Sequence, residues 1–221
     1  LVTTGGRGDM IILSHRSALG IWRTTARECE EDATTTSQGG IGFTSHHSWE
    51  PAIPFKPLRA MDLSQLHLAV SVSEVRSALR QLGPWLEPAL VDGHVHLLFP
   101  LHRKRIVVPG VRSHSWCERL PRCALYRMSK NVLISGPEFT LLQLAYGSTL
   151  VCSTSLSLEF CGFHSKANGS ESKLLTRRTP LTTPSRIGSL IDELPGAHGI
   201  KLIERPLPYL TAGSASPMET N

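Results

Sequence analysis

The apolar residues of this chain repeat with two different periods, and every run is short. At 75–82 and 187–194 they fall at i, i+3, i+4 and i+7, the spacing of one helix face. At 95–99 they alternate, as in a half-buried strand, and further short strands are predicted at 106–108, 124–128 and 132–134. The pattern predicts a mixed α/β (α+β) fold in which short strands and a basic hairpin are flanked by helices.

Helix start signals agree with this pattern. Ser71 with Glu74, and Ser135 with Glu138, match the capping box, in which each side chain bonds to the other residue's backbone N–H. Thr183 precedes a proline, which favours the first position of a helix. Helices are therefore predicted at 15–23, 71–82, 135–145 and 183–194. The segments 27–50 and 164–182 are polar and are predicted to be linkers.

Positive charge is concentrated in one segment. The chain has a net charge of +5, but residues 101–130 carry eight Lys or Arg against one acid, Glu118, which gives +7. The rest of the chain therefore sums to −2. A local basic segment in a mildly acidic protein indicates an anionic partner.

The predicted order of elements suggests how such a partner would bind. A helix at 71–82 followed by a hairpin of 95–99 and 106–108 is the order found in winged helix-turn-helix DNA readers. The helix arginines would then face the groove, and the hairpin tip would meet phosphates. The alternative is a solvated loop beside a helix with ordinary solubilising arginines. The predicted DNA-binding residues are Arg76, Arg80, Arg103, Lys104 and Arg105.

A second motif, Asp-Gly-His-Val-His at 92–96, raises the possibility of metal chemistry. His94 and His96 would share one strand face, and the motif resembles the first barrel strand of metal-dependent amidohydrolases. Those enzymes need a (β/α)₈ barrel of about 250 residues, and fewer than 130 residues follow His96. We therefore expect a plain strand face with no metal and no cofactor. A metal-dependent hydrolase using these two histidines is kept as the alternative.

Composition limits the setting of the protein. Hydrophobic residues make up 40% and charged residues 19%, which suits a folded core. No apolar run approaches the roughly 20 residues of a membrane-spanning helix. The five cysteines are odd in number and match no zinc or redox spacing, so free thiols in a reducing compartment are expected. These features predict a cytoplasmic protein without a membrane partner.

Three segments carry a resemblance to a known group of proteins. They read ILSHRSAL at 12–19, ISGPEFTLLQLA at 134–145 and GSASPMET at 213–220. They resemble bacterial proteins in which a region similar to the AbiEi antitoxins of type IV toxin–antitoxin systems precedes a domain similar to very-short-patch-repair endonucleases. The resemblance implies that the chain is the front part of a longer bacterial protein.

The same resemblance implies that the nuclease domain is absent here. Glu219 matches the glutamate that opens the first helix of the nuclease-like domain, but one carboxylate is an incomplete site for the metal of such nucleases. We therefore expect a non-catalytic regulatory or antitoxin-like fragment that binds duplex DNA or a partner such as a toxin. A protein–protein module with no nucleic-acid role is the other alternative. The expected domains are an N-terminal helix region (1–26), an acidic, proline-rich linker (27–60), an α/β domain with the basic segment (61–165), a linker and helix (166–215), and the start of a truncated nuclease-like domain (216–221).

Overall fold

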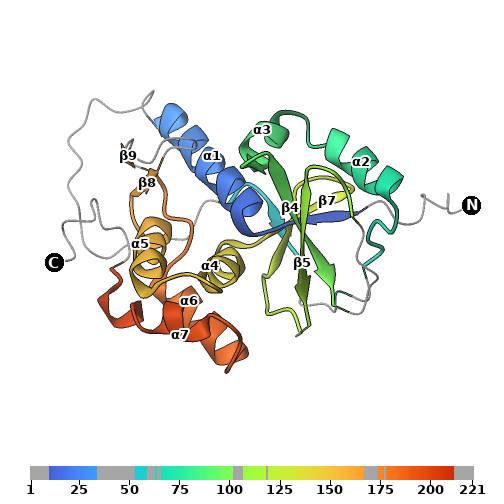
Figure 1. Cartoon of the computed structure of the whole chain (residues 1–221). Helices are drawn as coiled ribbons and strands as arrows, with labels where there is room; N and C mark the ends of the chain where they lie inside the picture. The colour runs from blue at the N-terminus through green and yellow to red at the C-terminus, as the bar shows by residue number, and fades with distance from the viewer. Residues whose placement is uncertain are drawn as a thin grey trace, which may run out of the picture. The chain divides into compact units, whose positions relative to one another are not determined.

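The computed structural model describes residues 10–33, 53–58, 63, 66–101, 107–117, 119–166, 174–176 and 178–211 (Figure 1). The chain forms two compact units. Unit 1 comprises Leu1–Ile21 and Phe55–Leu144, and unit 2 comprises Trp22–Pro54 and Ala145–Asn221. No helix in this described part has the length and apolar character needed to cross a membrane.

A mixed seven-stranded sheet forms the centre of unit 1. Its strands run in the order β2-β6-β7-β1-β4-β3, and β5 pairs with β4. β1 is parallel to β7 and antiparallel to β4, whereas β4 and β5 are parallel. The strands are β1 (Ile11–Leu13), β2 (Lys56–Pro57), β3 (Leu90–Val91), β4 (His94–Pro100), β5 (Val111–Trp116), β6 (Leu125–Arg127) and β7 (Val132–Ser135).

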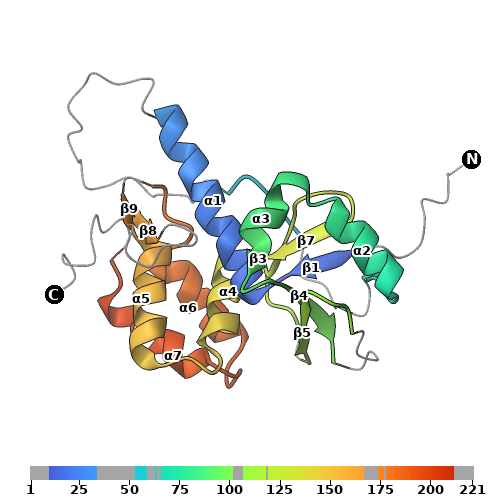
Figure 2. The same ribbon diagram turned by 45° about the horizontal axis from the view of Figure 1, so that its top comes forward.

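Short helices accompany this sheet. In both views α2 lies beside β1 (Figures 1 and 2). The helices are α1 (His15–Ala33), which continues into unit 2, α2 (Val72–Arg80), the 3-10 turn η2 (Gly83–Trp85), α3 (Leu86–Ala89) and α4 (Pro137–Ala145). The strands β1 and β7 are buried along their whole length, so the core of unit 1 is centred on them.

Unit 2 is mainly helical, with one small hairpin. α5 packs against α7 and against β8, and α6 packs against α7 (Figure 2). Its buried apolar residues include Phe160, Ile187 and Ile203. The elements are α5 (Leu150–Cys161), β8 (His164–Lys166), β9 (Leu174–Thr176), α6 (Pro184–Glu193), α7 (Ile200–Glu204) and the 3-10 turn η3 (Leu207–Tyr209).

Several sequence predictions are confirmed. The chain mixes helices with a sheet, and strands form at both β6 and β7. Ser71 and Glu74 form the predicted capping box of α2, and Thr183 caps α6 by accepting a bond from the Arg186 N–H. Asp92 and Gly93, both at positive φ, form the turn that joins β3 to β4. Local signals determine these features, which explains why the sequence revealed them.

The predicted basic hairpin is wrong. The described residues Val107 and Val108 do not pair with β4. Its partner β5 begins at Val111 and runs parallel to it. Val107 and Val108 lie outside any strand, because Pro109 cannot donate to a ladder and Gly110 turns the chain at φ +75°. The antiparallel hairpin that follows α2 in the described residues is instead β3–β4, with its turn at Asp92 and Gly93.

Three element boundaries also differ from the predictions. α1 runs to Ala33, well into the segment predicted to be a linker. The segment 164–182 contains the β8–β9 hairpin and the buried Arg178. Ser135 is the last residue of β7 and does not cap α4, which begins at Pro137. Polar composition predicted loops in the first two segments; in the second, tertiary contacts bury polar groups such as Arg178.

Candidate functional site

Two segments far apart in the sequence meet at the end of α2. The Asn131 side-chain amide, next to the β6–β7 turn, donates a hydrogen bond of 3.1 Å to Oε1 of Gln81, the residue that follows α2. Arg80 precedes Gln81 and Lys130 precedes Asn131, so this bond brings two cations toward each other. The surface that results is called the basic patch here and consists of Arg76, Arg80, Arg127 and Lys130.

All four side chains of the basic patch are exposed. Arg76 and Arg80 are four residues apart and therefore lie on the same face of α2. Arg127 donates a 3.1 Å hydrogen bond to the Lys130 carbonyl, which orders the tight turn between β6 and β7. In the described part of unit 1, Arg16 forms an ion pair with Asp92 that involves none of these residues.

The one acidic residue of α2 does not neutralise the patch. Glu74 Oε2 accepts hydrogen bonds from the backbone N–H groups of Val70 and Ser71, at 2.6 and 3.0 Å. The bond from Val70 is the main cause that lowers the pKa of Glu74. The carboxylate is thus held at the helix N-terminus, while the arginines lie toward its C-terminal end, where the helix dipole favours cations.

The predicted DNA-binding set is only partly located by the structure. Arg76 and Arg80 are exposed on α2. Arg103, Lys104 and Arg105 lie outside the described residues. Arg127 and Lys130 belong to the basic segment but are not among the predicted site residues. The hydrogen bond between Asn131 and Gln81 connects the turn that carries them to the end of α2.

A second group of interest is the histidine cluster, His15, His96 and His114, from α1, β4 and β5. His96 Nδ1 lies 2.9 Å from His114 Nε2, a hydrogen bond between imidazoles. The His15 ring stacks on His114 with centroids 3.5 Å apart and an interplanar angle of 18°. The centroids of His15 and His96 are 6.4 Å apart.

Backbone contacts hold the histidine cluster in place. His15 has a left-handed φ of +49° between β1 and α1, and its N–H donates to Gln143 Oε1 at 3.1 Å. The Ser17 hydroxyl donates to the Ala89 carbonyl at 2.5 Å and accepts a bond from the His96 N–H at 2.8 Å. A strained conformation in a polar, packed junction is a common feature of functional sites.

Burial is the main cause of low basicity in the histidine cluster. Desolvation, then the charges of His114 and His96, lower the pKa of His15 to about 3. Desolvation, then His114, Arg112, Arg16 and His94, lower the pKa of His96 to about 4. Both rings are therefore neutral at pH 7.

The structure does not bring His94 and His96 together as metal ligands. The His94 Nδ1 atom lies 2.7 Å from the Asp92 carbonyl, whereas His96 pairs with His114. Across the described ranges, no group of three or more His, Cys, Asp or Glu side chains has an arrangement suited to a metal ion. The stacked rings of the cluster explain this, because parallel imidazoles do not aim their lone pairs at one point.

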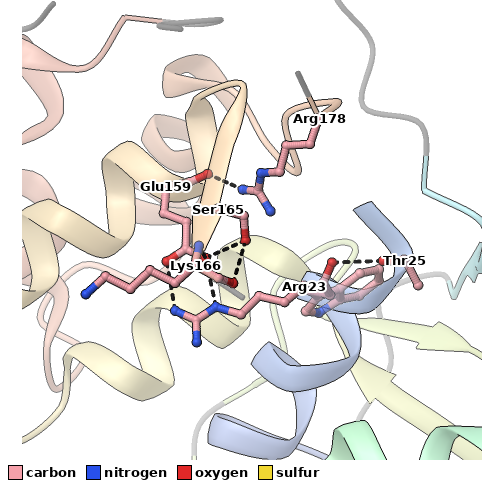
Figure 3. Close-up of polar contacts among 7 residues, drawn as sticks. Arg23, Thr25, Glu159, Ser165, Lys166 and Arg178 are labelled. Carbon is pink, nitrogen blue, oxygen red and sulfur yellow. Dashed lines mark hydrogen bonds and ion pairs between the residues drawn. The ribbon is translucent and has the colours of Figure 1, made fainter. Parts of the chain in front are cut away.

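Unit 2 contains a buried polar network that the sequence did not indicate (Figure 3). Arg23 of α1 forms two bonds to the carboxylate of Glu159 on α5, at 2.8 and 2.9 Å. The Ser165 hydroxyl and the Lys166 N–H also donate to Glu159 Oε1. Arg178 donates to the Glu159 carbonyl and is almost fully buried. These bonds tie α5 to both α1 and the β8–β9 hairpin, which is a structural role.

Glu219, the family-matched acidic residue, lies outside the described residues. Comparisons of the chain with protein-family models, with curated proteins and with solved structures found no match.

Proposed function

We propose that this chain is a non-catalytic, AbiEi-like regulatory or antitoxin-type protein that binds duplex DNA through the basic patch. The observation that carries the proposal is the junction of α2 with the β6–β7 turn, which gathers four exposed cations from two distant segments. Phosphate binding requires such a group, since Arg and Lys supply both charge and donors to phosphate oxygens.

The division of charge between the units supports the same proposal. Unit 1 has 14 Lys or Arg and 7 Asp or Glu, a net charge of +7. Unit 2 has 9 Lys or Arg and 11 Asp or Glu, a net charge of −2. An anionic polymer would therefore be attracted mainly to unit 1.

The partner is duplex DNA in this proposal because the patch combines a helix face with a turn. Arg76 and Arg80, one turn apart on α2, can contact neighbouring phosphates, and Lys130 adds a charge beside them. Phosphate contacts of this kind give affinity and register without reading the base sequence. The proposal therefore concerns binding and leaves the preferred sequence open to experiment.

The test is binding of the full chain to a fluorescently labelled duplex at increasing salt. Each phosphate contact contributes about −0.9 to the slope of log K against log salt. The double variant Arg76→Gln/Arg80→Gln should reduce the steepness of the wild-type slope by about 1.8. The control Lys201→Gln/Arg205→Gln removes two exposed cations from the end of α7 in unit 2 and should leave the slope unchanged.

Two outcomes would contradict the proposal. The first is no measurable affinity at low salt. The second is an equal loss in the α2 and α7 variants, which would indicate that only net charge matters. In either case a module that neutralises a partner protein becomes the better reading. That reading predicts that variants of the basic patch keep any toxin-neutralising activity.

A further inference from the structure

The histidine cluster brings side chains from three elements of unit 1 into contact. His15 belongs to the first turn of α1, His96 to β4 and His114 to β5. β5 has no fully buried residue, and in the described part of the chain its strand partner is β4. Besides that six-residue ladder, the ring contact of Trp116 with Phe139 and the imidazole of His114 attach β5 through side chains. A half-exposed strand with a single described strand neighbour opens more easily than the buried core.

The arrangement of the rings is suited to neutral imidazoles. The bond between His96 Nδ1 and His114 Nε2 needs one nitrogen with a proton and one with a lone pair. A further proton on the accepting nitrogen makes both atoms donors and breaks the bond. Protonation of His15 or His114 would also bring cationic rings together in a stack with a 3.5 Å centroid separation.

The surroundings favour the neutral state as well. On α1 the neighbouring charge is Arg16, which pairs with Asp92 of the β3–β4 turn at 2.8 Å. β4 adds His94, and β5 adds Arg112. α4 contributes the neutral amide of Gln143, and its one acid is Glu138. The charges that shift the pKa of His15 and His96 are therefore those of histidines and arginines, which all oppose protonation.

We infer that the histidine cluster is an acid-sensitive latch. When its imidazoles are neutral, they hold β5 and the start of α1 against β4. When they are protonated, β5 separates from the sheet. The released strand exposes the edge of β4, and an exposed strand edge can pair with another chain. The inference is independent of DNA binding, because it involves no residue of the basic patch.

Amide hydrogen exchange of the full chain tests the latch at pH 7.5 and pH 5.0, with rates corrected for intrinsic pH dependence. Opening of β5 should increase at pH 5.0, by about 30-fold for each histidine that is protonated only in the open state, given a free pKa of about 6.5. The β6–β7 hairpin is the internal reference and should change much less. An equal change in both hairpin and β5 would overturn the latch.

Variants separate the latch from a general effect of acid. In His15→Asn/His114→Gln the pH-dependent opening of β5 should be much smaller, because only His96 of the cluster remains, and Asn accepts the left-handed φ of position 15. His67→Gln, at an exposed histidine outside the cluster, should behave as wild type. If the double variant does not fold, ring-proton NMR of the wild type decides. Titration of His15 or His96 near pH 6.5 would overturn the inference, and protonation only below pH 5 would support it.

Discussion

Two ion pairs of this protein show how burial changes the role of a charge. Arg23 and Glu159 are nearly buried, with 18% and 6% of their side chains exposed, whereas Arg16 and Asp92 are 56% and 71% exposed. Both pairs lie at 2.8 Å. A buried charge that loses its partner cannot recover the solvation it lost on folding, but an exposed charge can.

We therefore expect Glu159→Gln to lower the free energy of unfolding by about 3 kcal/mol, because Arg23 is left buried without a counter-charge. The matched control is Asp92→Asn, which removes the exposed pair and should cost less than about 1 kcal/mol. Asn tolerates the positive φ of position 92, so the control does not strain the turn. Urea denaturation of each variant measures the difference. Similar losses in both would show that the Glu159 network contributes no more than a surface pair.

The buried residues of the two units differ in how clearly the sequence marks them. Glu159 is the single acid in an otherwise apolar and small stretch of α5, so a buried role could have been suspected. Arg178 lies in a polar segment and gave no signal, although it is almost fully buried. His15 and His114 were likewise unremarkable, because only the pairing of β4 with β5 and the start of α1 brings them to His96.

Among the elements, α1 and α6 both contain a glycine, but for different reasons. A Cβ at Gly20 of α1 would fall on the carbonyl oxygen of Pro88 in α3, so the two backbones touch there. A Cβ at Gly188 of α6 would make an ordinary contact of 3.8 Å with Leu207. Close packing against α3 thus requires a glycine at position 20. At position 188 there is room for a Cβ, and glycine only lowers the stability of the helix.

The same substitution should therefore have opposite effects at these two positions. Gly188→Ala should raise the free energy of unfolding by about 0.5–1 kcal/mol, since Ala loses less backbone freedom in a helix. Gly20→Ala should lower it by about 1–3 kcal/mol, because overpacking exceeds the gain in helix propensity. Thermal unfolding monitored by circular dichroism is a sufficient measurement. A stabilising Gly20→Ala would mean that α1 and α3 are not in backbone contact.

Elements with local start and stop signals were predicted well, and elements that depend on distant partners were not. The capped helices α2 and α6 agree with their sequence signals because capping involves neighbouring residues. The sequence did not predict that β4 pairs with β5 in parallel. The ten residues between the two strands are enough for the chain to return in either a parallel or an antiparallel orientation. The prediction of the site was incomplete for the same reason. Arg76 and Arg80 were identified on the helix, but the cations of the β6–β7 turn were not.

At the scale of the whole molecule, pH acts on three buried groups in the same direction. The folded pKa values of His15 and His96 are about 3 and about 4, both below the ordinary 6.5. The Arg23 guanidinium holds the pKa of Glu159 below its ordinary value, against the opposing effect of burial. When the folded pKa lies below the unfolded one, the unfolded chain binds more protons, and acid favours unfolding.

The stability of the protein should therefore be highest above pH 6.5 and fall in two steps. Between pH 6.5 and pH 4 the histidines become protonated in the unfolded chain but stay neutral in the folded cluster. At pH 5 this difference lowers the free energy of unfolding by about 2–4 kcal/mol. Below pH 4.5 the unfolded chain also protonates Glu159, so a further loss begins there. Urea midpoints at pH 7.5, 6, 5 and 4 measure both steps. The variant His15→Asn/His114→Gln should reduce the first step, to which His96 still contributes, and keep the second, whereas Glu159→Gln should keep the first step and remove the second. A profile that stays flat from pH 7.5 to pH 5 would mean that the histidines are as basic in the folded chain as in the unfolded one.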